Sequence, residues 1–493
     1  MSEAAASRRR RYLVPLALLA VTGPFLVFAA PAADAAGGPC VNNHRQEPLR
    51  PRSPGLLGAL SSGSSGAEAS PGDGSPDEDG AAPPWMKGHP GQLPIIRGHT
   101  EALHLVTGPG SPGRTDRTFG IAGTDLGVAL RGTDGGLMLV FGDTMACDST
   151  SDNWRSNTIV RTDDVDYTDG LEIREALTRR GWSTRGRAVE FIPSLKQPGY
   201  EHTTIPTAAI TVNGVHYVDY MSVRSWGAPG DWTTNYAGTV RSRDGVTWTP
   251  VEGSVRTNSG ASSLTRLHNL PRYREGNENL QMSSFIEHDG FVYRFSTPSG
   301  RGGAAVLGRA PVADFPDEDA FTFFDGENWF SPGDAKPHSG DGASARYDVG
   351  DAVPVLERPV SELSVTWNGY LGKFITLYTT DGGLVLRTAD ALTGPWSEER
   401  MVVDTGTVGD LYGGFVLPGD TGRDLYFVAT TWSNYNVLLM RTNLDELLGV
   451  PGRAGTGDDR VARTDPRPAA GAGYDPSGDD GLEVVGVVDY RDQ

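Results

Sequence analysis

Short apolar runs separated by turn-forming residues fill the chain from residue 100 onward. Residues 120–130 and 136–141 are two such runs, and Thr133-Asp134-Gly135-Gly136 joins them, a pattern that predicts a β-hairpin. Further tight hairpin turns are expected at Asn213-Gly214, Asp289-Gly290 and Asn368-Gly369. Long stretches of helical periodicity are scarce, so the pattern predicts an all-β protein.

One strand motif recurs five times, an apolar run that ends in arginine and a small residue. The copies are residues 159–162, 239–242, 306–310, 384–388 and 438–442. Another apolar run precedes each copy, at residues 136–141, 215–221, 291–296, 374–378 and 425–429. The candidate innermost strands come before those, at residues 121–128, 205–210, 282–286, 363–367 and 413–417. This recurrence predicts a five-bladed β-propeller with long rim loops, whereas a β-sandwich with insertions explains the strand density but not the fivefold repeat.

The N-terminal residues have the composition of an export signal. Four arginines, ending at Arg11, precede the apolar residues 13–30, and Ala33-Asp34-Ala35 follows, so we predict a signal peptide over residues 1–36. An uncleaved membrane anchor is the alternative, but proline and glycine interrupt the run and it is short for a spanning helix. The protein is therefore expected to be secreted, with association with the cell wall as one option, and to have no membrane contact after cleavage of the signal peptide.

Two low-complexity segments flank the predicted propeller. Residues 37–95 are rich in Ser, Gly, Pro and Ala, and we predict a disordered linker there. Residues 451–493 form an acidic tail rich in Gly and Asp, in which the apolar residues 482–488 could add one strand. The folded domain is expected over residues 96–450.

Composition narrows the function. The 493 residues carry a formal net charge of -19, which argues against a nucleic-acid partner and fits a neutral substrate. Only two cysteines occur, Cys40 and Cys147, so a disulfide framework is excluded although one bridge is allowed in an exported protein. The histidines His104, His202 and His216 lack the spacing of metal ligands, and we expect neither a metal nor a cofactor.

Asp125 and Asp143 each interrupt an apolar run of the first hairpin. Aspartate is depleted in strands and costs free energy when buried without partners, so two of them on paired strands indicate a site. The simpler interpretation is that both satisfy backbone N–H groups at strand ends. Glu362, at the head of the fourth innermost run, is a third candidate, and a solvent-exposed strand-entry residue is an equal alternative for it.

The chain resembles a bacterial family known as domain of unknown function 4185. The motifs that carry the resemblance are Thr124-Asp125-Leu126-Gly127, Phe141-Gly142-Asp143-Thr144, Trp154-Arg155-Ser156-Asn157, Ile205-Pro206-Thr207, Tyr220-Met221-Ser222-Val223 with Trp226-Gly227, Gln281-Met282-Ser283-Ser284-Phe285, Thr297-Pro298-Ser299-Gly300-Arg301, Glu362-Leu363-Ser364-Val365-Thr366-Trp367-Asn368 and Tyr412-Gly413-Gly414. Members with an assigned activity look like endo-D-arabinanases, five-bladed propeller glycoside hydrolases that cut α-linked D-arabinofuranose chains of mycobacterial arabinogalactan and lipoarabinomannan. The resemblance implies that Asp125 and Asp143 are catalytic and that the partner is a polysaccharide.

Cleavage of a glycosidic bond needs one carboxylic acid and one carboxylate. We expect Asp125 to act as base or nucleophile and Asp143 as general acid. The predicted substrate-binding residues, most of them in the family-like motifs, are Trp154, Arg155, Asn157, His202, Arg224, Trp226, Gln281 and Arg301. Arginine can bind sugar hydroxyls and tryptophan can stack on a sugar face.

Two other functions remain open. Residues 242–248 approximate a sialidase box but are one residue short of it, and a sialidase would also use three channel arginines and a tyrosine nucleophile. The other alternative is a non-catalytic propeller that binds cell-wall glycan. The two buried aspartates distinguish the hydrolase from this binder, which has no need for them.

Overall fold

A computed structural model of the protein describes residues 91–147, 153–197, 199–261, 270–336, 346–419, 422–432, 434–449 and 482–489. All of them belong to one compact unit. The predicted signal peptide, Cys40 and most of the predicted linker and tail lie outside the described residues.

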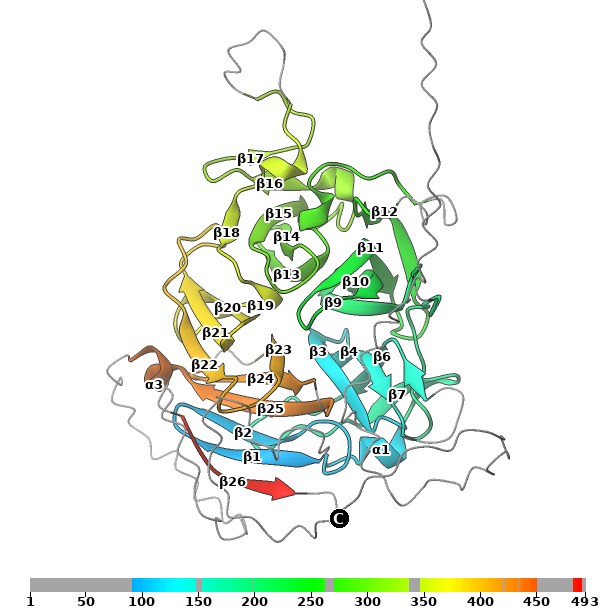
Figure 1. Ribbon diagram of the computed structural model, residues 1–493, viewed down its shortest axis with the longest axis vertical. Helices are drawn as coiled ribbons and strands as arrows, with labels where there is room; N and C mark the ends of the chain where they lie inside the picture. Colours follow the sequence, from blue (N-terminus) through cyan, green and yellow to red (C-terminus); the bar gives the residue numbers. More distant parts are fainter. Residues whose placement is uncertain are drawn as a thin grey trace, which may run out of the picture. The chain divides into compact units, whose positions relative to one another are not determined.

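Five antiparallel sheets surround a common centre (Figure 1). Their innermost strands are β3 (Gly123–Arg131), β9 (Thr203–Val212), β13 (Met282–His288), β19 (Ser361–Asn368) and β23 (Leu411–Val416). Each innermost strand contacts the next, and β23 contacts β3, so the series closes on itself. This ring confirms the predicted five-bladed β-propeller.

Four blades follow the chain outward from the centre. The first continues through β4 (Leu137–Met145), β6 (Thr158–Thr162), β7 (Glu175–Thr178) and β8 (Gly181–Ser183), with β5 (Trp154–Arg155) also paired to β4. The second adds β10 (Val215–Trp226), β11 (Trp232–Ser242) and β12 (Thr249–Thr257). The third adds β14 (Phe291–Thr297), β15 (Ala305–Pro311), β16 (Thr322–Phe324) and β17 (Trp329–Phe330), with β18 (Pro354–Leu356) paired to β15. The fourth adds β20 (Lys373–Thr380), β21 (Gly383–Ala389) and β22 (Arg400–Asp404).

Among the described residues, helix occurs only as short segments between strands. They are α1 (Thr115–Thr118), α3 (Leu444–Leu448) and the 3-10 turns η2 (Asn277–Asn279), η3 (Glu318–Ala320) and η4 (Val349–Asp351). Within the described ranges, none has the length and hydrophobicity that crossing a bilayer requires.

The fifth blade combines strands from opposite parts of the sequence. It contains β23, β24 (Asp424–Thr431) and β25 (Asn436–Asn443), and its outermost strand is β2 (Thr100–Leu105) (Figure 1). Thr100 pairs with Thr442 and Leu105 with Leu438, so β2 is antiparallel to β25. The sequence pattern did not predict this pairing, which fixes the last blade to the segment before the first.

A further pairing joins the two flanking segments. β1 (Gln92–Arg97) and β26 (Glu483–Asp489) form a two-stranded antiparallel sheet. Leu93 and Val484 of this sheet are buried in the same apolar cluster as Leu105 and Leu438. Ordered structure therefore extends on both sides of the expected domain, into the predicted linker and tail.

The repeated arginines that revealed the blades all lie on the third strand of their sheet. They are Arg161 of β6, Arg241 of β11, Arg309 of β15, Arg387 of β21 and Arg441 of β25. Four of them bind the next segment outward. Arg161 pairs with Glu175, Arg441 pairs with Glu101, Arg387 donates to the Ser397 carbonyl, and Arg309 lies over the Trp329 ring at 4.0 Å. The motif thus fastens outer strands to the blade, because arginine can pair with carboxylates, carbonyls and aromatic faces.

A buried ion cluster joins the second and third blades. Arg256 on β12 lies 2.6 Å from the carboxylate of Asp219 on β10 and 3.1 Å from that of Glu318 in η3. Glu318 also pairs with Arg294 on β14. Arg256 and Asp219 are fully buried, and the Arg256 Nε donates to the Leu280 carbonyl just before β13. The cluster therefore helps to set where the third innermost strand begins.

We expect Arg256→Ala to lower the free energy of unfolding by about 3–5 kcal/mol, because it leaves the buried Asp219 carboxylate without its counter-ion. Urea denaturation followed by tryptophan fluorescence measures this. Arg274→Ala is the matched control, since Arg274 and Asp319 form an exposed pair whose loss should cost less than about 1 kcal/mol. Equal losses in the two variants would contradict the structural role assigned to the cluster.

Candidate active site

Asp125 and Asp143 lie on β3 and β4, at the end of the hairpin away from its turn. Thr124 pairs with Thr144, and the two aspartates adjoin that pair, one on each strand. The register shifts on both sides of Leu126, whose φ of 66° is left-handed backbone. Such irregularities cost free energy and redirect neighbouring side chains, and they are common at functional sites.

Gly142 provides the space for the Asp125 carboxylate. A Cβ atom at this position would collide with Asp125 Oδ1 and would approach the Leu126 side chain to 3.2 Å. The absence of a side chain therefore lets the carboxylate of one strand lie against the backbone of the other.

Asp143 receives hydrogen bonds from two blades. Its Oδ1 accepts from Trp154 Nε1 at 2.9 Å and from Thr203 Oγ1, at the start of β9, at 3.1 Å. An indole N–H can only donate, so Asp143 Oδ1 is an acceptor. Lys196 Nζ lies 4.8 Å from the centre of the Trp154 ring and 2.7 Å from the Glu190 carboxylate. Asp143 therefore has both direct donors and a nearby positive charge.

Asp125 has fewer donors. Its Oδ2 accepts one hydrogen bond, from the Tyr412 hydroxyl of β23 at 2.9 Å. Its Oδ1 is buried and has no hydrogen-bond partner in the part of the chain that the structure describes. A buried charged oxygen without a partner is unfavourable, so this atom is better suited to carrying a proton.

These surroundings raise the pKa of both aspartates. Burial raises the pKa of Asp143 to about 6, and the hydrogen bonds from Trp154 and Thr203 limit the rise. The pKa of Asp125 is raised well above its ordinary value, first by burial and then by the charge of Asp143, and the Tyr412 hydrogen bond offsets only part of this. Neighbouring carboxyl groups with raised pKa values in different surroundings are suited to acid–base chemistry.

Glu362 belongs to the same electrostatic cluster. It lies near the start of β19 with a φ of 40°, and its carboxylate accepts from Arg301 Nε at 3.0 Å and Nη2 at 2.9 Å. The Arg301 guanidinium lies 4.7 Å from the centre of the Tyr412 ring. The charge of Glu362 raises the pKa of Asp125 and that of Arg301 lowers it. Glu362 is thus a neighbour of the aspartates that is already held by a cation.

An arc of aromatic and cationic side chains runs beside the aspartates. The Trp154 and His202 ring centres are 5.6 Å apart, His202 and Trp226 are 6.4 Å apart, and Trp226 and Trp232 are 5.9 Å apart. The Arg301 guanidinium lies 5.9 Å from the Trp232 ring. The arc starts at the donor to one aspartate and ends beside the donor to the other.

Several residues of this site were not predicted from the sequence. Thr203 is the first residue of β9 and Tyr412 the second of β23, and Tyr412 stands in a family-like motif, so their positions at the heads of innermost strands are the signal that marks them. Lys196 is one of few lysines in an arginine-rich chain. Tyr435 follows β24, and burial together with the charges of Asp143 and Asp125 raises its pKa well above the ordinary value. No local pattern marks Tyr435, because ring closure brings it to the site.

The family profile described as "Domain of unknown function (DUF4185)" matches residues 110–441. The chain belongs to this family.

Relatives of this DUF4185 protein have varied descriptions. "Notoamide biosynthesis cluster protein J" of Aspergillus sp. (strain MF297-2) is 27% identical over 358 residues, which cover 68% of this chain and 86% of that protein. Among solved structures, the α-L-arabinofuranosidase PaAbf62A from Podospora anserina matches at 13% identity and a TM-score of 0.37, covering 71% of this chain and 98% of that one. The exo-β-1,3-galactanase Pc1,3Gal43A from Phanerochaete chrysosporium matches at 10% identity and a TM-score of 0.36, covering 64% of each chain.

Three predicted substrate-binding residues of the DUF4185 motifs are buried and bonded inside the fold. Arg155 donates to two backbone carbonyls at 2.6 and 3.0 Å. Asn157 bonds both ways to the backbone of Ile192, in the loop before β9. Gln281 donates to the Asn277 carbonyl at 2.7 Å. These contacts fix the loops around the site.

The other predicted binding residues lie nearer the surface. Arg224 donates to the Gly260 carbonyl at 2.9 Å and so holds the loop after β12. His202 is half-buried between the Trp154 and Trp226 rings, and burial lowers its pKa. Arg301 is engaged by Glu362. The structure therefore brings Trp154, His202, Trp226 and Arg301 together near the aspartates.

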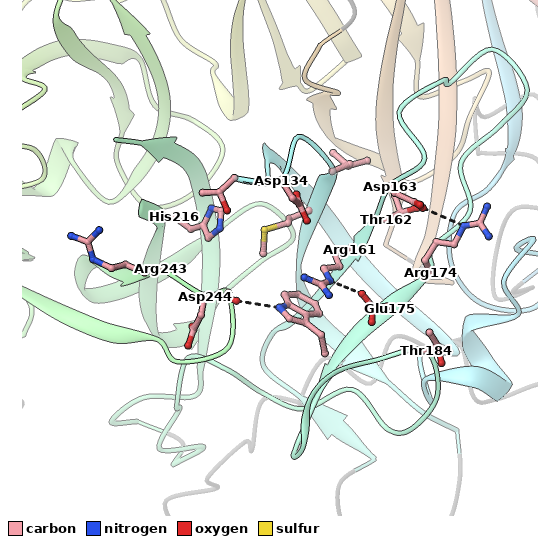
Figure 2. Close-up of a pocket in the computed structure, with 16 residues that line it drawn as sticks. Asp134, Arg161, Thr162, Asp163, Arg174, Glu175, Thr184, His216, Arg243 and Asp244 are labelled. Carbon is pink, nitrogen blue, oxygen red and sulfur yellow. Dashed lines mark hydrogen bonds and ion pairs between the residues drawn. The ribbon is translucent and has the colours of Figure 1, made fainter. Parts of the chain in front are cut away.

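A cavity of about 360 Å³ lies at the other end of the first blade of this DUF4185 protein (Figure 2). Asp134, in the β3–β4 turn, and His216 line it. β3 separates this cavity from Asp125 by roughly 20 Å, at about 3.3 Å per residue. Arg161 and Glu175 of the lining pair with each other at 2.6 Å. The cavity is therefore distinct from the aspartate site.

Cys147 follows Asp143 in the chain and is disulfide-bonded. The other cysteine of the sequence, Cys40, lies outside the described residues. No three histidine, cysteine or carboxylate side chains gather as a metal site in the portion that the structure describes.

We expect Asp143→Asn to raise the melting temperature at pH 7.5 by a few degrees more than at pH 4. The pKa of Asp143 is about 6 in the folded protein and 3.8 ordinarily, so the folded state binds this proton more tightly. Protonation of Asp143 therefore stabilises the folded wild-type protein fully below pH 4, and this stabilisation is lost as the pH rises through 6. Asparagine does not titrate, so the variant does not lose stability in this way. Thermal melts at both pH values measure the difference. A difference that is the same at both would contradict the raised pKa.

Proposed function

We propose that this protein is a secreted glycoside hydrolase that cleaves α-linked D-arabinofuranosyl bonds in mycobacterial-type cell-wall arabinan. The observation that carries the proposal is the pair of aspartates at the end of one hairpin, where Asp143 Oδ1 accepts two hydrogen bonds and Asp125 Oδ2 accepts one. Hydrolysis of a glycosidic bond requires such a pair. A protein that only binds glycan gains nothing from the free energy spent on burying two neighbouring carboxyl groups.

The contacts favour Asp125 as the acid and Asp143 as the carboxylate, the reverse of the order expected from the sequence. Asp143 Oδ1 accepts two hydrogen bonds and lies near the Lys196 charge, which favours its ionised form. Asp125 Oδ1 has no donor among the residues that the structure describes, and the charge of Asp143 acts on it, which favours the protonated form of Asp125.

In the proposed reaction Asp125 gives its proton to the glycosidic oxygen as the bond to the anomeric carbon breaks. The ionised Asp143 acts in one of two ways. In an inverting enzyme it takes a proton from the attacking water molecule, and in a retaining enzyme it attacks the anomeric carbon itself. In the retaining case a water molecule then hydrolyses the bond between the sugar and Asp143, giving its hydroxyl to the anomeric carbon and its proton to Asp125. In the inverting case the water gives its hydroxyl to the anomeric carbon and its proton to Asp143, from which a proton returns to Asp125 through solvent. Tyr412 holds the Asp125 carboxyl through its hydroxyl.

The choice of arabinan rests on the family. The motifs around Asp125, Asp143 and Tyr412 resemble those of DUF4185 members that look like endo-D-arabinanases, and the family profile covers residues 110–441. The net charge of -19 suits a neutral glycan better than an acidic one. The predicted signal peptide would deliver the protein to a cell-wall substrate.

A sialidase is disfavoured by the tyrosine nearest the aspartates. A tyrosine nucleophile must ionise during the reaction. The pKa of Tyr412 is raised well above its ordinary value, chiefly by burial, which opposes ionisation.

We expect Asp125→Asn and Asp143→Asn each to lower the rate of arabinan hydrolysis by about 10²–10⁴-fold, the usual contribution of one general acid or base. Release of reducing ends from mycobacterial arabinogalactan measures the rate. Asp134→Asn is the matched control, because Asp134 lies in the turn at the far end of the same hairpin and should leave the rate unchanged. Folded aspartate variants with full activity would refute the proposal, and a wild-type protein that binds arabinan without cleaving it would favour the glycan binder.

We expect the activity to fall below about pH 6, because Asp143 then takes up a proton and loses its charge. Thr203→Val removes one donor to the Asp143 carboxylate, so it should raise this pKa and move the acidic limb of the kcat/KM profile to higher pH. The profile is measured from pH 4 to 9 on the same polysaccharide. A limb that stays in place or moves to lower pH would be inconsistent with Asp143 as the carboxylate.

A further inference from the structure

Two exposed tryptophans lie at the end of the ring where the aspartates are. Trp226, the last residue of β10, is 41% exposed, and Trp432, directly after β24, is 40% exposed. Singly exposed apolar side chains are ordinary on protein surfaces, so it is the position of these two rings at the aspartate end that makes them candidates for ligand contact. β10 belongs to the second blade and β24 to the fifth, and these blades flank the first blade on either side (Figure 1).

Trp226 is held in place by neighbouring rings. Its ring packs edge-on against His202 and Trp232, with ring centres 6.4 and 5.9 Å away. His202 in turn packs against Trp154, which donates to Asp143, so His202 and Trp154 link Trp226 to that carboxylate. Trp226 therefore presents a fixed aromatic surface on the side of the second blade.

Trp432 belongs to the fifth blade, on the other side of the β3–β4 hairpin from Trp226. Its backbone N–H donates to the Asp410 carbonyl at 3.0 Å. The carbonyl of Tyr435, in the same β24–β25 turn, accepts from the N–H of Thr124 at 2.9 Å, and Thr124 precedes Asp125. The turn that carries Trp432 is therefore bonded directly to the strand that carries the acid.

We propose that Trp226 and Trp432 are sugar-stacking platforms on opposite sides of the aspartate pair, so that a polysaccharide chain lies across the first blade from the fifth blade to the second. The carbohydrate class of the ligand rests on the proposed function. An aromatic face packs against the apolar C–H face of a sugar, and the indole N–H remains available to a hydroxyl. The acid and the carboxylate lie between the platforms, so sugar units on both sides of the cleaved bond are bound.

Binding is tested in the Asp143→Asn protein, which should not consume its ligand, by titration calorimetry with mycobacterial arabinogalactan. Trp226→Ala and Trp432→Ala are each expected to weaken binding about tenfold, the loss typical of one aromatic anchor. Trp432→Phe keeps an aromatic face and should restore most of the affinity. Trp367→Ala is the control, because Trp367 is also exposed, at 42%, but lies at the other end of β19 from Glu362. Melting curves verify that each variant is folded.

Each outcome bears on the platforms separately from the hydrolysis. Losses in both folded tryptophan variants with no loss in the Trp367 control support the proposal. Unchanged affinity in either variant, an equal loss in the control, or no binding of the polysaccharide at all overturns it. If the wild-type protein releases no reducing ends and the two tryptophans still govern binding, the platforms stand and the hydrolase proposal falls.

Discussion

Two carboxyl groups are held together at the buried end of one hairpin, and the rest of the site follows from that constraint. Burial disfavours the charged form of both groups, and the charge of Asp143 further disfavours that of Asp125. The fold provides the two carboxyl groups with different hydrogen-bond donors. Asp143 receives donors from Trp154 of the first blade and Thr203 of the second, whereas Asp125 receives, among the described residues, only Tyr412 of the fifth. This difference in hydrogen bonding favours a proton on Asp125 and a charge on Asp143, so it assigns the two groups different roles in proton transfer.

No single blade could build this site. The third and fourth blades contribute Arg301 and Glu362, whose ion pair lies against the Tyr412 ring. The ring of innermost strands therefore acts as a frame that brings side chains from every blade to one end. The buried cluster around Arg256 also joins separate parts of the ring, since it links two blades and bonds to the backbone just before β13.

The sequence was informative where a residue broke its local pattern. The fivefold strand repeat predicted the blades, and Asp125 and Asp143 were visible because aspartate is out of place in an apolar strand. Motif membership alone could not separate Asn157, which fixes a loop, from Trp226, which faces solvent, because both uses depend on tertiary contacts. Tyr435 and the β2–β25 pairing had no local signature at all, because each depends on two segments that meet only when the ring is complete.

The pairing of β2 with β25 has a consequence for how the chain reaches its native state. β2 is made early in synthesis, but its hydrogen-bonding partner is more than 300 residues further along. Such a non-local contact raises the contact order and slows folding, because a long loop must close before the contact is gained. Until β25 emerges, β2 has an unpaired edge that could bind other chains. Completion of the fifth blade is therefore the folding step that closes the ring and covers this edge of β2, which reduces the tendency to aggregate.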